Sequence, residues 1–326
     1  MPDAATRHPD LTRGYTLAVI SAVILSTTAI FIRYLTVTYN IPALVLAFWR
    51  EGFVAVTLAA ALARLRPALL RVERRHLRYL AAYGLVLAVF NGLWTLSVAL
   101  NGAAVSTVLV YSSAAFTALL GRWLLAERLG WAKIAAVALS LAGCLLLSGA
   151  FDPAAWRGGA ASVATGILSG LGYAAYTLMG RSAAQRGLAP WTTVLYTFAF
   201  AAVFMLAANL SPLPLATGRA PSPGDLFWLG GAWRGWAVLF VLAAGPTLGG
   251  YGLYTVSLAY LPSSVVNLIA TMEPAITAAI AYVVLGERLN GVQIAGSVLI
   301  LGAVVLLRVY EGWRAAPAAA PLPDDF

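Results

Sequence analysis

Residues 265–289 read VVNLIATMEPAITAAIAYVVLGERL, an apolar run that is interrupted near its middle by Glu273 and Pro274. About 20 apolar residues in a helix cross the hydrocarbon core of a bilayer, and this run is long enough to do so. Its ending has a close copy, AERL at residues 126–129, in the first half of the chain. These features predict a membrane-spanning helix with a polar break, in a chain that duplicates part of itself.

The composition extends this prediction to the whole chain. Of the 326 residues, 61% are hydrophobic and only 10% are charged, and the mean hydropathy is +0.84. One soluble core cannot bury that much apolar surface. We therefore predict an all-α integral membrane protein with ten transmembrane helices, at residues 14–34, 43–63, 79–99, 103–124, 131–149, 160–179, 190–209, 236–259, 263–285 and 291–308.

The basic residues predict the orientation of these helices. If the N-terminal tail, residues 1–13, lies in the cytoplasm, most of the 21 Lys and Arg residues fall on that side. The positive-inside rule then places both termini, including the tail 309–326, on the cytoplasmic side of a bacterial inner membrane. The arginine-rich stretch 64–78 is interpreted as an anchor beside anionic lipid headgroups and not as a nucleic-acid site, so the net charge of +9 reflects topology. The polar start does not indicate a cleaved signal peptide.

The two halves of the chain repeat each other. Shifting residues 94–149 by 160 positions aligns Glu127-Arg128-Leu129 with Glu287-Arg288-Leu289 without a gap. The repeats are predicted to cover residues 14–149 and 158–308, with five spans each. An odd number of spans gives the two copies opposite orientations in the membrane. Inverted repeats of this kind form a pseudo-two-fold architecture with a substrate site near the midplane.

These motifs resemble those of the drug/metabolite transporter superfamily, specifically its ten-helix EamA-type branch, which includes the YddG-type aromatic amino acid exporters. The resemblance covers nearly the whole chain as two EamA repeats. It implies an inner-membrane exporter of small metabolites, often amino acids. The residues that carry the resemblance are Glu273-Pro274, Gly286-Glu287-Arg288-Leu289, Ala126-Glu127-Arg128-Leu129, Arg50 after Phe48-Trp49, and Leu25-Ser26-Thr27-Thr28.

The chain departs from the family pattern at two places. Leu25 stands where a tryptophan is common in the first span, and Ser113-Ala114 stands in the fourth span where the ninth has Glu273-Pro274. The resemblance therefore supports the superfamily more firmly than the subfamily, and it does not fix the substrate.

Glu273 is the leading candidate for a functional residue. It lies ten residues into its predicted span, near the bilayer centre, where an ionised carboxylate needs a cavity, a partner or a proton. Pro274 cannot donate a hydrogen bond to the carbonyl of Ala270, which favours a bend at this level. Two interpretations remain: Glu273 binds a substrate amine or a proton, or it satisfies backbone groups of a neighbouring helix.

Arg50 is the second charged candidate, seven residues into its span and beside Glu51. Neighbouring helical residues point roughly 100° apart, so the two side chains are expected to pair only loosely. Arg50 is a candidate for binding a substrate carboxylate, and an ion pair or a backbone contact is the alternative.

Polar and aromatic side chains recur at matching depths of several spans. Because residues three or four positions apart share one face of a helix, each pair is expected to line a cavity with rings and hydrogen-bonding groups. The alternative is that they join helices or form an interfacial belt. The pairs are Asn91 with Trp94, Thr107 with Tyr111, Tyr251 with Tyr254, and Asn267 with Thr271. Further candidates near the same depth in the first and sixth spans are Ser26, Thr27, Tyr173 and Tyr176.

The sequence excludes some function classes and leaves others open. It has no phosphate-binding loop for ATP, no cysteine-rich or histidine metal motif, and no evident catalytic set, so we expect neither a cofactor nor an enzyme. The predicted function is a secondary transporter that exports small metabolites, above all amino acids including aromatic ones. Alternatives are export of cationic drugs, nucleotide sugars or lipid-linked groups, and an intramembrane enzyme. Its partners are expected to be substrate and membrane lipids, in a monomer or homodimer that is driven by protons or by the substrate gradient.

Small residues recur at every fourth position of the fifth span, from Ala132 through Ala136, Ser140 and Cys144 to Ser148. Such a stripe lets helix backbones approach closely. It is interpreted as a packing seam, either within the chain or between two copies.

Overall fold

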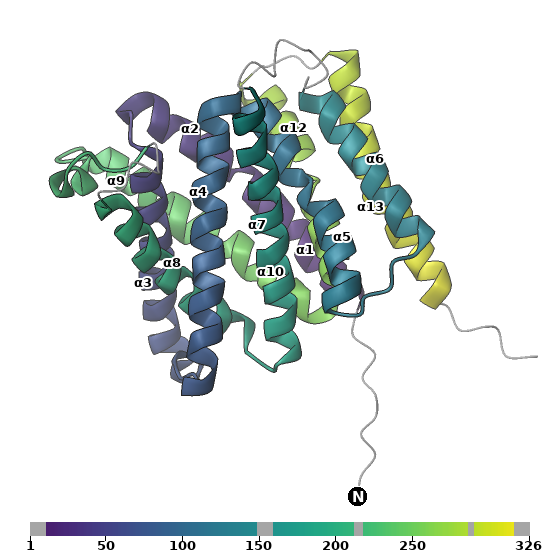
Figure 1. Ribbon diagram of the computed structural model, residues 1–326, viewed down its shortest axis with the longest axis horizontal. Helices are drawn as coiled ribbons and strands as arrows, with labels where there is room; N and C mark the ends of the chain where they lie inside the picture. The colour runs from purple at the N-terminus through teal and green to yellow at the C-terminus, as the bar shows by residue number, and fades with distance from the viewer. Residues whose placement is uncertain (1–10, 149–158, 212–217, 286–289, 316–326) are drawn as a thin grey trace, which may run out of the picture.

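The computed structural model describes residues 11–148, 159–211, 218–285 and 290–315. Within these ranges, it leaves out the side chains of residues 29, 33, 98–105, 107, 159, 161, 162, 281, 282, 284, 285 and 311–315. Every regular element in the described part is helical, as Figure 1 shows.

The first half contains α1 (Leu11–Ser26), α2 (Thr28–Tyr39), α3 (Ala43–Leu65), the short helix η1 (Pro67–Leu70), α4 (Arg74–Tyr111), α5 (Ser113–Leu124) and α6 (Trp131–Ser148). The second half contains α7 (Gly159–Gln185), α8 (Pro190–Leu210), η3 (Pro223–Phe227), α9 (Trp233–Leu242), η4 (Ala243–Thr247), α10 (Leu248–Tyr260), α11 (Ser263–Ala270), α12 (Glu273–Leu285) and α13 (Gly291–Ala315). Together they account for all ten predicted spans, so the ten-helix membrane architecture is confirmed.

Several spans consist of more than one helix. The first is α1 followed by α2, the eighth runs from α9 through the π-helical turn η4 to α10, and the ninth is α11 followed by α12. The third and fourth spans meet within the bounds of α4. There the hydroxyls of Ser97 and Ser106 lie 3.0 Å apart, whereas nine residues of straight helix rise about 13.5 Å. The chain therefore reverses direction between these two serines.

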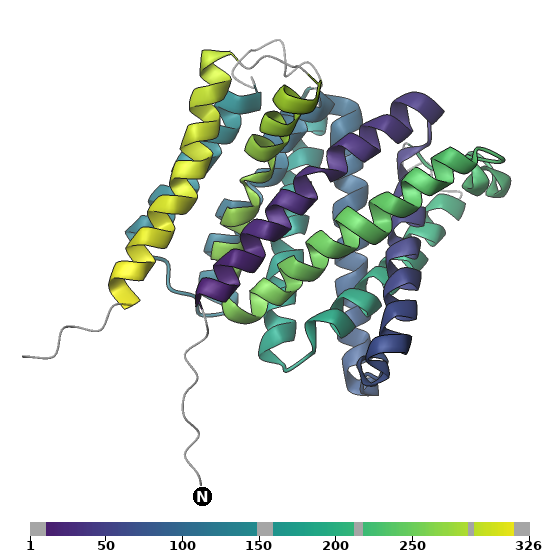
Figure 2. The same ribbon diagram turned by 180° about the vertical axis from the view of Figure 1, so that it is seen from behind.

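Each span packs mainly against a span of the other half. Figure 1 shows α4 beside α7 near the middle, α3 beside α8 at one edge and α6 beside α13 at the other, and these pairs share extensive contacts. Figure 2 shows α1 lying along α10 on the opposite face. The core thus lies between the two halves and not within either of them.

The α6–α13 pair shows how small residues permit this packing. A Cβ atom added to Gly143 in α6 would lie 2.7 Å from the carbonyl oxygen of Gly296 in α13, closer than real Cβ contacts allow. Ala136, Ser140 and Cys144 of the same helix are almost completely buried. At these positions, the small-residue seam of the fifth span is internal to the chain.

The long connection before the eighth span packs through aromatic rings. The Trp49 ring lies 5.4 Å from Phe227 and 4.9 Å from Trp236, and its Nε1 donates a 2.6 Å hydrogen bond to the carbonyl of Leu226. The connection is therefore fixed to the second span, one turn or less from Arg50 and Glu51.

Candidate functional site

Breaks in three spans define the centre of the molecule. α11 ends at Ala270 and α12 begins at Glu273, while α4 ends at Tyr111 and α5 begins at Ser113. The shift of 160 residues superposes Ser113 on Glu273, so the two breaks are equivalent positions of the repeat. The third break, at Thr27, separates α1 from α2.

A hydroxyl group donates to a backbone carbonyl at each of the three breaks. Thr271 donates to the carbonyl of Leu268 at 2.5 Å, Ser112 to that of Leu109 at 2.5 Å, and Thr27 to that of Ile24 at 2.7 Å. Such bonds to the residue three positions earlier compete with the regular helical ladder. In the ninth span, Pro274 also lacks the N–H that would continue it. The fourth span also breaks, at Ser112, although it has no Glu-Pro pair.

Glu273 lies at the first turn of α12, with tyrosines around it. Its carboxylate is within hydrogen-bonding reach of the Tyr111 hydroxyl across the two equivalent breaks. Tyr173, Tyr251 and Tyr254 are also close enough to interact with it electrostatically. The structure thus brings Glu273, Tyr111 and these tyrosines close together, and their role in binding a substrate stays a prediction.

Two further charged residues, Arg50 and Glu51, lie beside these tyrosines. Glu51 is completely buried, and one of its oxygens accepts a 2.6 Å hydrogen bond from Nδ2 of Asn91. Arg50 is 8% exposed. The Tyr251 ring lies near enough to interact with Arg50, Glu51 and Glu273, so it links the two charged groups.

Glu51 is the residue that the sequence prediction missed as part of the site. Its position beside Arg50 predicts only a loose ion pair, although an acidic residue at this depth of an apolar helix is itself a signal. What identifies it is its bond to Asn91, 40 positions away in the sequence, and no local pattern encodes that contact.

Asn267 forms a network that joins four helices. Its Oδ1 accepts from Ser113 at 2.9 Å, and its Nδ2 donates to Thr177 at 3.0 Å and to the Tyr254 hydroxyl at 3.4 Å. The Thr271 hydroxyl accepts a 2.5 Å hydrogen bond from the hydroxyl of Ser140 in α6. The contacts of Asn267 and Thr271 are those of residues that connect helices.

The remaining candidates occupy different environments. The hydroxyls of Ser26 and Thr27 both donate to carbonyls of their own helix, those of Val23 and Ile24. Tyr176 is fully buried, with its ring 5.6 Å from that of Tyr251, and Trp94 is only partly buried against the core. The side chain of Thr107 lies outside the described residues.

Glu127, from the AERL motif, connects the two halves at one end of the bundle. Its two carboxylate oxygens accept hydrogen bonds from the backbone N–H and the hydroxyl of both Ser263 and Ser264, at 2.6 to 3.2 Å. These are the first residues of α11, whose N–H groups have no partner within the helix. Lys133 donates a further bond to Ser264 at 3.0 Å. The copy of this motif at residues 286–289 lies outside the described residues.

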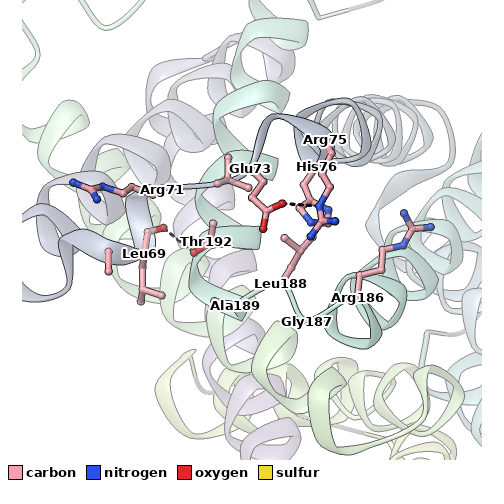
Figure 3. Close-up of a pocket in the computed structure, with 12 residues that line it drawn as sticks. Leu69, Arg71, Glu73, Arg75, His76, Arg186, Gly187, Leu188, Ala189 and Thr192 are labelled. Atoms are coloured by element: carbon pink, nitrogen blue, oxygen red, sulfur yellow. Dashed lines mark hydrogen bonds and ion pairs between the residues drawn. The ribbon is translucent and has the colours of Figure 1, made fainter.

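A surface cavity of about 340 Å³ lies at the same end of the molecule, between the α3–α4 and α7–α8 connections (Figure 3). Arg71, Arg75, His76 and Arg186 line it, together with Glu73, which pairs with Arg75 at 2.6 Å. These side chains are largely exposed, and the cavity is formed by loops at the end of the bundle. It is therefore separate from the central cluster, by which we mean Glu273 and the tyrosines near it, Tyr111, Tyr173, Tyr251 and Tyr254.

Comparisons with known proteins agree with this architecture. The sequence matches the EamA-like transporter family over residues 12–149 and again over 160–309. It is similar to an uncharacterized transporter of Archaeoglobus fulgidus, with 28% identity over 306 residues, which are 92% of this chain and 96% of that protein. A solved crystal structure shares the fold, with a TM-score of 0.71 at 15% identity, over 92% of this chain and 98% of the other.

Proposed function

Since this chain belongs to the EamA-like transporter family and is thus a multi-pass membrane transporter, we propose that it is a secondary exporter of small metabolites, with amino acids, including aromatic ones, as its main substrates. The observation that carries the proposal is the pair of equivalent helix breaks that bring Glu273 and Tyr111 together between the two halves. Broken helices of inverted repeats are typical of substrate sites near the midplane of transporters.

The lining of the site favours a substrate with both a ring and charged groups. Tyr173 stacks on Phe90 with ring centroids 5.0 Å apart and lies 6.1 Å from Tyr254. Flat apolar rings next to a few polar groups suit amphipathic ligands. Arg50, Glu51 and Glu273 supply both signs of charge beside these rings.

Transport follows from alternating access around this site. The contacts between halves would separate first at one end of the bundle and then at the other, while the central cluster stays in place. We propose that both termini lie in the cytoplasm of a bacterial cell, because the exposed arginines near Arg71, Arg75 and Arg186 gather at the end where α1 starts and α13 ends (Figure 1). The Glu127 contacts would then close the cytoplasmic side.

A counterflow assay tests the substrate class. Purified protein in liposomes is loaded with one unlabelled amino acid, and uptake of labelled amino acids is followed. We expect exchange of aromatic and other amphipathic amino acids, and the control is a variant with the site disrupted, Tyr173→Ala. If no amino acid exchanges, the amino acid proposal is wrong.

One observation favours a second candidate, export of cationic drugs. The central region holds two carboxyl groups, the buried Glu51 and the half-buried Glu273, against the single guanidinium of Arg50. A hydrophobic cation would balance this excess of acidic groups. Exchange of a quaternary ammonium dye but of no amino acid in the same assay would favour this candidate.

A further inference from the structure

The second span carries a carboxylate and a guanidinium side by side, Glu51 and Arg50, and each has a hydrogen-bonding group without a partner among the described residues. Glu51 is completely buried and accepts its 2.6 Å bond from Asn91 through one oxygen. Its other oxygen, Oε2, is inaccessible to solvent and has no hydrogen-bond partner among the described residues. A buried carboxylate oxygen without a partner is costly, so a donor is expected at this position in at least one state of the protein.

Arg50, the adjacent residue, has a donor that lacks an acceptor. Arg50 is 8% exposed, and its Nε–H is buried and without a hydrogen-bond partner in the part of the chain that the structure describes. An Arg side chain carries five donors and no acceptor, so this group calls for an anion or a carbonyl oxygen. A donor is thus missing beside Glu51, and an acceptor is missing beside Arg50.

We propose that Glu51 binds the ammonium group of an α-amino acid and that Arg50 binds its carboxylate, an assignment that rests on the proposed amino acid export. An α-amino acid carries both charges on substituents of a single carbon atom. A simple cation would leave Arg50 without its acceptor, and a simple anion would leave Glu51 without its donor. A zwitterion supplies both missing partners at once.

The neighbours of the pair fit this assignment. Asn91 orients the Glu51 carboxylate through the first oxygen and leaves Oε2 for the ligand. Tyr251 lies close to both charged residues and connects them to the tyrosines near Glu273. A substrate held by Arg50 and Glu51 would therefore extend its side chain toward these rings. Glu273, which already has Tyr111 within hydrogen-bonding reach, is left free for a different role.

The experiment compares an aromatic amino acid with two analogues, one without the amino group and one without the carboxylate. Each competes for counterflow in liposomes that contain the wild type, Glu51→Gln or Arg50→Gln. Glu51→Gln keeps the size of the side chain and an acceptor for Asn91. We expect it to weaken binding of the amino acid and the amine by at least about tenfold, and to leave binding of the deaminated acid unchanged.

Arg50→Gln is expected to have the mirrored effect, a loss for the amino acid and the deaminated acid but not for the amine. Glu51→Asp keeps the charge and should retain the preference for compounds with an ammonium group. Because these readouts are ratios among ligands of one folded variant, a general loss of stability does not imitate them. If Glu51→Gln misfolds, Arg50→Gln and Glu51→Asp test the assignment alone.

Three results would overturn the inference while leaving amino acid export intact. The first is equal loss for all three compounds in each variant, which would mean a structural role. The second is unchanged competition in Glu51→Gln. The third is loss of a pH or sodium dependence with unchanged ligand ratios, which would make Glu51 a proton or cation site. If the wild type exchanges no amino acid at all, the proposed function fails first and this inference fails with it.

Discussion

Glu51 and Glu273 are two acidic residues within apolar spans, and their surroundings differ: Glu51 is completely buried, whereas Glu273 is half-buried. Glu51 is fixed by an amide donor, whereas Glu273 faces a tyrosine hydroxyl at a helix break. A carboxyl group at such a break can gain or lose a proton when the surrounding helices move. We therefore assign the coupling role, if transport is driven by protons, to Glu273.

Glu273→Gln tests this role. Glutamine keeps the shape and the contact with Tyr111 but cannot titrate, so substrate exchange should continue while uptake driven by a pH gradient falls to the level of protein-free liposomes. Both are measured in the same preparation, with Glu73→Gln, a change at an exposed acid, as the control. Full pH-driven uptake by Glu273→Gln would exclude the proton role.

The lack of a side chain at Gly296 allows α6 and α13 to approach closely. A Cβ atom there would lie 2.6 Å from the backbone nitrogen of Leu147 and 2.7 Å from the carbonyl of Gly143, and neither backbone atom can move easily. Gly302, two turns later in α13, has open space around it. Gly296→Ala is therefore expected to destabilise the protein by about 1–3 kcal/mol.

Thermal unfolding in detergent measures this difference. Gly302→Ala serves as the matched control, and it should be neutral or slightly stabilising because alanine is the better helix former by about 1 kcal/mol. Equal melting temperatures for the two variants would show that the close approach of α6 and α13 does not support the fold.

At the scale of elements, the contact between Glu127 and the N-terminus of α11 is the one most suited to act as a gate. One carboxylate, that of Glu127, satisfies four donors of Ser263 and Ser264 from the other half of the chain. A hydrogen bond to a charged group contributes about 1.5–3 kcal/mol, so loss of the charge should shift the population toward states open at this end.

Cysteine labelling measures that shift. With Cys144 replaced by alanine, a cysteine is introduced at Val266, which is fully buried one turn inside α11. Its reaction with a polar maleimide added on the side of the arginine-rich loops should be at least about fivefold faster in Glu127→Gln, corresponding to about 1 kcal/mol. The control is Glu73→Gln at the same end. An unchanged labelling rate would remove Glu127 from the gate.

The helices themselves were predictable because length and hydropathy determine a span whatever its neighbours are. The break at Glu273-Pro274 was predictable for the same reason, since the lack of a proline N–H is a local property. The break at Ser112 and the four bonds of Glu127 were not predicted. At the first, the Ser112 hydroxyl donates to the carbonyl of Leu109, a bond that the sequence pattern does not indicate. The second joins residues more than 130 positions apart.

At the scale of the whole molecule, the two halves form one core and not two. The pairs α4–α7, α3–α8, α6–α13 and α1–α10 each take one helix from either half. Polar links cross the same interface, such as the bond from Ser21 to the carbonyl of Gly250 at 2.8 Å. The central cluster thus lies where the halves meet, which is where inverted-repeat transporters typically have their substrate site.

The most direct test of this account is the accessibility of the break beside Glu273 from the two sides of the membrane. A cysteine replaces Met272 in a Cys144→Ala background, and polar maleimides are added to one side at a time, with and without substrate. We predict labelling from both sides, slowed by substrate in each case. Labelling from one side only, or labelling that substrate does not affect, would contradict a central substrate site with alternating access.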